Sequence, residues 1–272
     1  MGCFRVVGHP ISHSLSPLIH SEFARQADIE IDYQICELPK EDFASNARAL
    51  FDSGVSGLSV SLPFKRAAYE MAEIKTAYAD RAQSANTLWV REGKIHGDNT
   101  DGRGLVQDLT DNQKMSLSGK RVLIIGAGGA TLGIVGPLLD AGALITVINR
   151  TPLAEDHPLR REPVEIIDFV GFSSEDARFD LVINATSAGL AGEIHWPFTS
   201  ILPGAVAYDL SYTRSHETPF TQWALAFGAA KAVDGFGMLV QQAALQFEIF
   251  NGVRVRTEGL EIGENGRVNG LK

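Results

Sequence analysis

The sequence predicts an α/β protein of two domains, the second with a parallel sheet. Short apolar runs typical of strands alternate with stretches of helical spacing along most of the chain. The alternation is interrupted by the polar segment 111–120, which contains Ser118-Gly119, and then starts again with six further strand-like runs. A glycine-rich turn follows the first strand of this second series. We therefore expect one domain from residues 1–101 and 238–272, and a dinucleotide-binding domain from residues 102–237.

The first series of elements is predicted from apolar runs bounded by polar or turn residues. Its strands are expected at 4–7, 33–36 and 58–60, its helices at 17–26, at 40–51 and after Phe64, and a hairpin-like pair at 86–90 and 94–96. Pro63 is expected to be the first residue of the helix that follows it, and Ser16 is expected to cap the helix that begins at Pro17.

The second series reads as strands connected by helices, which predicts parallel pairing. Its strands are expected at 122–125, 144–148, 164–167, 181–183, 206–208 and 231–233. The final helix is expected at 238–250 and is placed with the first domain. The tail from Asn251 has no apolar period, so no structure is expected there.

Charge and cysteine content narrow the range of partners. The chain has 272 residues, with 24 Lys and Arg against 33 Asp and Glu, and a formal net charge of −9. Nucleic acids and anionic membranes bind basic surfaces, so we expect neither as a main partner. Residues 122–139 carry no charge, but Gly126, Gly128, Gly129 and Pro137 break the run into strand, turn and helix. With only two cysteines, a cytoplasmic location is expected.

The glycine-rich turn comprises Gly126, Ala127, Gly128, Gly129 and Ala130, between a predicted strand and a predicted helix. Backbone amides at such a helix start can bind a pyrophosphate, which predicts a Rossmann-like fold. The sixth position of the dinucleotide fingerprint is Thr131 rather than Gly or Ala, so a tight turn without a ligand remains an alternative.

The end of the next strand indicates which cofactor to expect. An NAD site would carry Asp or Glu there, whereas this chain has Asn149, Arg150 and Thr151. A guanidinium and a hydroxyl suit a ribose 2′-phosphate, so the expected cofactor is NADP. The alternative for Arg150 is a solvated charge at the end of a strand.

Lys65 and Asp101 are the candidate acid/base pair. Lys65 and Arg66 fall in the first turn of a predicted helix, where the helix dipole disfavours cations and makes a lysine easier to deprotonate. In Asp98-Asn99-Thr100-Asp101-Gly102, helix capping accounts for Asp98 or Thr100 and leaves Asp101 as a partner for a lysine. A solvated surface lysine is the alternative.

Two further chemistries are not supported by the residue pattern. The seven histidines are scattered, so no metal site is expected. No G-x-S-x-G nucleophile elbow is present, which weakens a hydrolase interpretation.

Taken together, these motifs resemble the shikimate dehydrogenases, NADP-dependent enzymes of chorismate and aromatic amino-acid biosynthesis. The resemblance covers about nine tenths of the chain, in unbroken order. The matching stretches are Val7 to Pro17, Pro63-Phe64-Lys65, Ala85-Asn86-Thr87, Gly97 to Gly102, Gly126 to Ala130, Asn149-Arg150-Thr151, Asn184-Ala185-Thr186-Ser187, and Asp234 to Ala243.

The resemblance implies reversible transfer of a hydride between NADPH and the C5 carbonyl of 3-dehydroshikimate, with Lys65 and Asp101 as catalytic residues. It implies that the substrate carboxylate binds Ser14, Ser16 and Tyr212. Ser61, Asn86, Asp101 and Gln242 would bind the ring hydroxyls. Matching positions on the cofactor side are Gly126 to Ala130, Asn149, Arg150, Thr151, Thr186, Leu210, Gly235 and Met238. Shikimate or 3-dehydroshikimate is the small-molecule partner, and a monomer or homodimer is expected.

Departures from the family pattern keep two alternatives open. Family members often have Asn at Ser59 and Thr at Ser61, and a second arginine usually follows the Asn-Arg-Thr motif, where this chain has Pro152-Leu153-Ala154-Glu155-Asp156. The 2′-phosphate would then depend on Arg150 alone, or on Arg160 or Arg161. One alternative is a quinate/shikimate dehydrogenase that uses NAD or NADP. The other is a non-catalytic ligand-binding protein on the same fold, because fold does not determine function.

Overall fold

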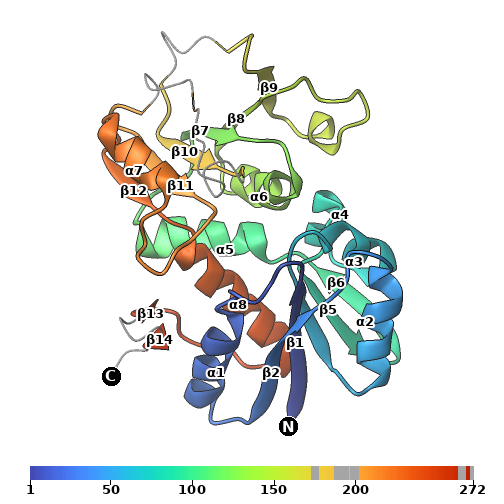
Figure 1. Ribbon diagram of the computed structural model, residues 1–272. Helices are drawn as coiled ribbons and strands as arrows, with labels where there is room; N and C mark the ends of the chain where they lie inside the picture. Colours follow the sequence, from blue (N-terminus) through green and yellow to red (C-terminus); the bar gives the residue numbers. More distant parts are fainter. Residues whose placement is uncertain (173–177, 187–195, 197–201, 263–267, 270–272) are drawn as a thin grey trace. The chain divides into compact units, whose positions relative to one another are not determined.

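A computed structural model describes residues 1–172, 178–186, 196, 202–262 and 268–269. The chain forms two compact units, Met1–Leu105 with Leu239–Lys272, and Val106–Met238 (Figure 1). Two helices run from one unit into the other: α5 (Asp101–Gln107) and α8 (Phe236–Asn251). Each unit has its own six-stranded sheet. We refer to them below as unit 1 and unit 2.

The sheet of unit 1 is mixed, with the strand order β2-β1-β3-β5-β6-β4. The parallel pairs are β1–β2, β1–β3 and β4–β6, and the antiparallel pairs are β3–β5 and β5–β6. The strands are β1 (Gly2–Gly8), β2 (Ile31–Glu37), β3 (Gly57–Val60), β4 (Ile74–Lys75), β5 (Thr87–Arg91) and β6 (Lys94–Asp98). The helices are α1 (Ser16–Ala27), α2 (Phe43–Asp52), α3 (Lys65–Met71) and α4 (Ala77–Ala82), together with most of α8.

Side chains of β1 alternate between the two faces of this sheet, as the strand period requires. Val7 packs with residues of α2 and α3 on one face, and Phe4 and Val6 pack on the other. There the Phe4 ring stacks on Phe250 of α8 at 4.8 Å. Figure 1 accordingly shows α1 and α8 on one side of the sheet and α2 and α3 on the other. The helix α8 therefore belongs to the core of unit 1 although it comes last in the chain.

Unit 2 contains a parallel sheet with the order β12-β11-β10-β7-β8-β9. Its strands are β7 (Arg121–Ile125), β8 (Leu144–Asn149), β9 (Glu165–Asp168), β10 (Leu181–Asn184), β11 (Val206–Asp209) and β12 (Lys231–Val233). Its helical segments are the π-helix η1 (Asp108–Asn112), α6 (Gly129–Asp140), the 3-10 helix η2 (Pro158–Arg161) and α7 (Pro219–Ala226). Strand order reverses between β7 and β10, and ligands of such sheets bind beyond the carboxyl ends of the strands at that point.

The predicted strands and major helices are present, and the predicted α/β class with a parallel second sheet is confirmed. The elements that the sequence analysis missed are short. The strand β4 has two residues and α4 has six, too few to show a period. Beyond the end of α8, β13 (Glu261–Ile262) and β14 (Val268–Asn269) pair antiparallel. The expectation of an unstructured tail is therefore wrong at these four residues, because a two-residue ladder leaves no apolar pattern.

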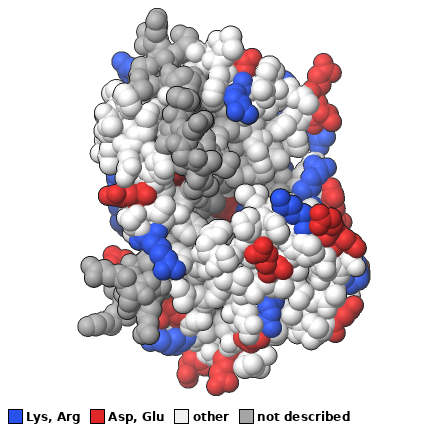
Figure 2. Space-filling view, viewed as in Figure 1, with Lys and Arg blue, Asp and Glu red and all other residues white. Residues whose placement is uncertain are grey.

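The described surface carries both signs of charge. Figure 2 shows acidic and basic side chains interspersed on the face in view. No helix within the described part of the chain has the length and apolar character needed to cross a bilayer. Both cysteines, Cys3 and Cys36, are free thiols.

His20 lies in the apolar layer between α1, α8 and the sheet of unit 1. It is completely buried, and its ring stacks on Tyr33 at 4.1 Å. Burial lowers the pKa of His20 to about 3, against a smaller opposing effect of the Gln246 amide. The folded protein therefore holds this imidazole neutral under conditions in which the unfolded chain binds a proton.

This difference predicts an acid-sensitive core. Below pH 6.5 the unfolded chain protonates His20 and the folded protein does not until about pH 3. The free energy of unfolding should therefore fall by about 1.4 kcal/mol per pH unit across that window from this residue alone. A His20→Phe variant should lose this part of the pH dependence in urea titrations at pH 7, 6 and 5. The control is exposed His13→Gln, and equal slopes for wild type and His20→Phe would contradict the prediction.

Candidate active site and cofactor-binding region

Lys65 is the first residue of α3. The turn before it is closed by the Phe64 amide, which donates to the Ser61 carbonyl at 3.0 Å, and the buried Phe64 ring stacks on Phe43 at 5.0 Å. Pro63 lies inside this turn, so the expectation that it is the first helical residue is wrong. The helix begins after Phe64, and the turn sets Lys65 at its start.

Lys65 and Asp101 form an ion pair in unit 1. Lys65 Nζ lies 2.6 Å from Asp101 Oδ2, with 19% of the lysine side chain and 9% of the aspartate side chain exposed. Asp101 is the first residue of α5, and its amide donates to Asn99 Oδ1 at 3.1 Å. The two residues that the sequence singled out thus contact each other across 36 positions of the chain. A charge-assisted bond at this partly desolvated place holds the ammonium more firmly than a surface pair would.

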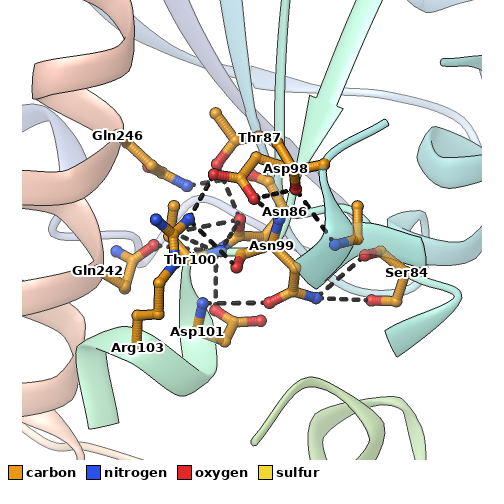
Figure 3. A network of polar contacts seen from close by, with 12 residues as sticks. Ser84, Asn86, Thr87, Asp98, Asn99, Thr100, Asp101, Arg103, Gln242 and Gln246 are labelled. Carbon is orange, nitrogen blue, oxygen red and sulfur yellow. Dashed lines mark hydrogen bonds and ion pairs between the residues drawn. The ribbon is translucent and has the colours of Figure 1, made fainter. Parts of the chain in front are cut away.

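The second oxygen of Asp101 is held by Asn86 (Figure 3). Asn86 Nδ2 donates to Asp101 Oδ1 and to Thr100 Oγ1, both at 2.8 Å, and lies 3.3 Å from Gln242 Oε1. Asn86 Oδ1 accepts from the Thr100 amide at 2.9 Å. Asn86 is only 2% exposed. The carboxylate is therefore fixed through both oxygens, one by a cation and one by an amide.

Gln242 reaches this cluster from α8, and Gly104 of α5 allows it to do so. A Cβ built on Gly104 would lie 2.6 Å from the Gln242 backbone nitrogen and 2.8 Å from its Cβ. The helices α5 and α8 could not pack this closely with any larger residue at position 104. The Gln242 side chain is further fixed by its Nε2, which donates to the Leu239 carbonyl at 2.8 Å.

Ser14 and Ser16 lie together before and at the start of α1. Ser14 Oγ donates to Ser16 Oγ at 3.2 Å and accepts from the Ser16 amide at 3.3 Å. The helix begins at Ser16 itself, so the expected N-cap role of Ser16 is wrong. Ser14 is the residue that accepts a helix-start amide, so it has a structural role besides the binding role that the resemblance implies. Ser61 follows the carboxyl end of β3 in the same unit, and Tyr212 belongs to unit 2.

Three residues of this network were missed by the sequence analysis as parts of the site: Asn99, Thr100 and Gln246. Asn99 Nδ2 donates to the carbonyl and hydroxyl oxygens of Ser84, both at 3.1 Å. The available signal was the density of polar residues in the loop 98–101, all of which the structure buries. Buried polar side chains are expected to be hydrogen-bonded, so such a run indicates a network.

In unit 2, the glycine-rich turn follows the carboxyl end of β7. Gly126 has φ of +100°, and a Cβ there would lie 2.7 Å from Thr186 Cγ2, so the turn requires glycine at this position. Thr131, the unusual sixth residue of the fingerprint, is fully buried and donates from Oγ1 to the Gly126 carbonyl at 2.7 Å. The Thr131 hydroxyl, in the first turn of α6, thus stabilises the glycine-rich turn that precedes the helix.

The space around this turn suits a phosphate ligand. The helix α6 begins at Gly129, and its first amides have no acceptor within the helix. Among the described residues, no atom would lie within 4 Å of a Cβ on Gly128 or on Gly129, so these residues leave the backbone open to a ligand on that side. A turn of this kind has the open backbone that a pyrophosphate requires, and the binding role of these residues stays a prediction.

The end of β8 forms one wall of a cavity of about 160 Å³. Asn149 is the last residue of the strand, and its Nδ2 donates to the Thr151 carbonyl at 2.9 Å. Arg160 also lines this cavity. Its Nε and Nη2 donate to the carbonyls of Ala154 at 3.0 Å and Leu153 at 2.9 Å. Arg150 is exposed at the strand end. The structure thus places a second guanidinium by the Asn-Arg-Thr motif.

The remaining positions expected on the cofactor side follow β10, β11 and β12. The Thr186 amide and hydroxyl both donate to Asn184 Oδ1. A Cβ on Gly235 would lie 2.4 Å from the Leu210 carbonyl oxygen, so glycine permits these two segments to touch. The Met238 amide donates to the Tyr208 hydroxyl at 3.2 Å. These segments meet at the carboxyl ends of neighbouring strands. Ser187, which belonged to the matching motif, lies outside the described residues.

Comparisons with known proteins agree with this division of the chain. Residues 6–88 match the shikimate dehydrogenase substrate binding domain, 114–194 a putative NAD(P)-binding domain, and 235–260 the shikimate 5′-dehydrogenase C-terminal domain. A relative from Alkalilimnicola ehrlichii named shikimate dehydrogenase (NADP(+)) is 46% identical over 259 residues, 92% of this chain and 94% of the relative. The chain belongs to the shikimate dehydrogenase family.

Solved structures support the same family. Shikimate 5-dehydrogenase from Thermus thermophilus, in complex with NADP(H) and shikimate, matches with a TM-score of 0.84 at 30% identity, over 95% of this chain and 97% of that one. An Ael1 enzyme from Pseudomonas putida matches with a TM-score of 0.86 at 35% identity, over 94% and 96%. The expected family, fold class, oxidoreductase activity and NADP cofactor are confirmed.

The close contact between Gly104 and Gln242 predicts that a larger residue at position 104 will disturb both the packing of α5 on α8 and the position of Gln242. Gly104→Ala should lower the free energy of unfolding by about 1 to 3 kcal/mol, because overpacking outweighs the better helix propensity of alanine. Turnover should fall as well, because Gln242 is displaced. Urea unfolding and steady-state kinetics measure the two effects. Gly129→Ala, with open space around its Cβ, is the control for stability; a stable Gly104→Ala enzyme would show that the helices can separate at no cost.

Proposed function

We propose that, when this protein reduces the C5 carbonyl of 3-dehydroshikimate to the hydroxyl of shikimate, Lys65 delivers the proton to the carbonyl oxygen. Asp101 holds the Lys65 ammonium in position. The observation that carries the proposal is the 2.6 Å contact between Lys65 Nζ and Asp101 Oδ2, with Asn86 on the other carboxylate oxygen. A cation fixed in this way can donate a hydrogen bond to an oxygen that becomes negative during reduction.

The proton moves between Lys65 Nζ and the substrate oxygen. During reduction, negative charge develops on the C5 oxygen as the carbon gains a hydride, and Lys65 transfers a proton to that oxygen. In the reverse direction Lys65 accepts the hydroxyl proton. Asp101 keeps the nitrogen in position throughout, because its carboxylate cannot turn while Asn86 binds its other oxygen.

The substrate carboxylate and hydroxyls need separate partners. We assign the carboxylate to the hydroxyls of Ser14, Ser16 and Tyr212, and the ring hydroxyls to Ser61, Asn86, Asp101 and Gln242. Ser14 and Ser16 are already within hydrogen-bond distance of each other, and Asn86 Nδ2 bonds to both Asp101 Oδ1 and Gln242 Oε1. A polyhydroxylated ring requires such pairing, since each unpaired buried polar group costs about 1 to 3 kcal/mol.

NADP, when bound, supplies or accepts the hydride. The turn Gly126 to Ala130 and the start of α6 would bind its pyrophosphate, and Thr186, Leu210, Gly235 and Met238 would border its nicotinamide end. Asn149, Arg150 and Thr151 would hold its adenosine end. We add Arg160 to this set, because it lines the cavity beside Asn149 and Thr151 and its guanidinium is already oriented by two carbonyls.

A quinate/shikimate dehydrogenase that uses NAD or NADP remains a second candidate function. Glu155 and Asp156 stand where a second arginine is usual in the family, which weakens the preference for NADP over NAD. A spectrophotometric assay of NADP reduction with shikimate, repeated with quinate and with NAD, separates the two activities. We further propose a cytoplasmic enzyme, consistent with two free thiols, acting as a monomer or homodimer.

Lys65→Ala should lower kcat by about 10²- to 10⁴-fold, because proton transfer then depends on water. Asp101→Asn should lower kcat in the same direction, since the ammonium loses its charged partner. The matched control is Arg66→Ala, which removes a neighbouring exposed cation of α3 paired with Glu70 and should leave kcat within about twofold. Near-normal turnover by Lys65→Ala would overturn the role assigned to it.

Arg150→Gln and Arg160→Gln should each raise the KM for NADP by about tenfold or more, since a charge-assisted bond contributes about 1.5 to 3 kcal/mol. The KM for NAD should stay unchanged, because NAD has no 2′-phosphate. Titration of the ligand-free protein with NADP, followed by fluorescence, should show the same loss of affinity. Arg161→Gln removes the adjacent exposed cation and serves as the control for the loss of one positive charge in this segment. An unchanged NADP affinity in Arg160→Gln would remove that residue from the site.

A further inference from the structure

A chain of three polar side chains runs through the core of unit 1 and takes no part in the proposed reaction. Tyr33 on β2, Ser59 on β3 and Gln246 on α8 are 7%, 4% and 2% exposed. The Tyr33 hydroxyl donates to Ser59 Oγ at 2.6 Å, and Ser59 Oγ donates to Gln246 Oε1 at 2.6 Å. Gln246 Nε2 in turn donates to the Asn86 carbonyl at 3.0 Å. These hydrogen bonds connect β2 and β3 of the sheet to the helix α8 that packs on it.

One end of this chain reaches the serine pair. Burial raises the pKa of the Tyr33 hydroxyl, and the nearby hydroxyls of Ser59 and Ser16 oppose this rise. Ser14 Oγ donates to Ser16 Oγ. These are the two serines assigned to the substrate carboxylate. The chain therefore begins beside the group that binds one end of the substrate.

The other end reaches the acid/base pair through Asn86. The carbonyl of Asn86 accepts two bonds, from Gln246 Nε2 and from the Val60 amide at 2.7 Å. The side chain of the same residue donates to Asp101. From Tyr33 to the Asn86 carbonyl every side-chain donor points in the same direction along the chain, and hydrogen bonds aligned in this way polarise and strengthen one another in a buried environment.

We propose that Gln246 is a positioning residue for this reaction, holding Asn86 so that its Nδ2 is directed at Asp101. Gln246 is the member that joins β3, β5 and α8, because its amide both accepts from Ser59 and donates to the residue that precedes β5. Without the amide, the Asn86 carbonyl loses one of its two bonds and the Ser59 hydroxyl loses its acceptor, both in the interior. Asn86 can then shift, and Asp101 and Lys65 shift with it.

The sequence of this chain offers a reason for the arrangement. Ser59 stands where family members often have Asn, and its short side chain donates one bond, to Gln246 Oε1. Gln246 is the residue that continues the chain to Asn86. The pairing of a short side chain on β3 with a long amide on α8 thus connects the serine pair to Asp101 in this protein.

This inference rests on the proposed roles of Lys65 and Asp101, and the test compares two glutamines of α8. Gln246→Leu should lower kcat about tenfold with the KM for shikimate changed by less than about threefold. The shift of Asn86 and Asp101 misaligns the reacting groups, whereas binding also depends on Ser14, Ser16 and Ser61, which do not contact Gln246 in the proposal. Gln241→Leu is the matched control. Gln241 is 5% exposed and donates to Thr257 Oγ1 at 2.9 Å, so its loss should lower stability and leave kcat within about twofold.

A smaller change covers the case in which Gln246→Leu does not fold. Ser59→Ala removes a single oxygen from the chain and should lower kcat about threefold, again with little change in the KM for shikimate. Wild-type kcat in Gln246→Leu, or in Ser59→Ala where it alone folds, overturns the proposal. An equal fall of kcat in Gln241→Leu also overturns it, because the effect would then be general loosening of α8.

The same measurements distinguish this inference from the proposed function. If Lys65→Ala and Asp101→Asn keep their turnover, the proposed roles fail and the inference fails with them. If both lose turnover while Gln246→Leu and Ser59→Ala keep it, the proposed roles stand and only the positioning role of Gln246 is overturned.

Discussion

The candidate site of unit 1 depends on the bonds that Asn86 makes with four surrounding segments. Its amide donates to the Asp98 carbonyl at 3.0 Å, and its carbonyl accepts from Val60 and from Gln246. Its side chain binds Thr100 and Asp101. An asparagine has just enough donors and acceptors for this set, so any replacement leaves buried groups unpaired. The orientation of Asp101, and through it the position of Lys65, follows from a residue that bears no charge.

In unit 2, the corresponding constraint is close backbone approach. A Cβ on Gly237 would lie 2.4 Å from Asp108 Cγ, and Gly126 and Gly235 face comparable contacts. Asp108 is buried and accepts from the Tyr208 hydroxyl at 2.7 Å. Burial next to this carboxylate raises the pKa of Tyr208, so that the phenol stays protonated and can donate. Glycines and buried polar pairs together let the loops after β7 and β10 meet, and likewise those after β11 and β12, which leaves the backbone itself as the surface available to a cofactor.

The sequence predicts those parts of the molecule that leave a periodic or chemical pattern. Alternating apolar runs indicate the strands, and Lys65 with Asp101 can be singled out because capping and packing do not account for them. The role of Gln246 could not be predicted, since a glutamine in an apolar helix has no pattern that distinguishes it from a solvent-facing one. Its contacts arise from the packing of α8, residues 236–251, against strands from the first hundred positions. The sequence could not decide whether Arg160 lies near the proposed 2′-phosphate site, because its position beside Asn149 depends on the path of the turn 151–157.

The net charge of −9 opposes two anionic ligands, and the structure indicates how binding can still occur. Charges in physiological salt are screened beyond about 8 Å, so the distant acidic residues contribute little to the field at either site. What counts is the immediate surroundings. Around the proposed substrate these are the Lys65–Asp101 ion pair and neutral hydroxyls and amides. Around the proposed phosphates they are the first amides of α6, Arg150 at the end of β8, and Arg160, which lines a cavity together with Asp168. Neutral donors held in a rigid network pay no cost of like-charge repulsion among themselves, and they discriminate by geometry. A polar network of asparagine, glutamine and serine therefore suits the recognition of a polyhydroxylated acid better than a cluster of cations would.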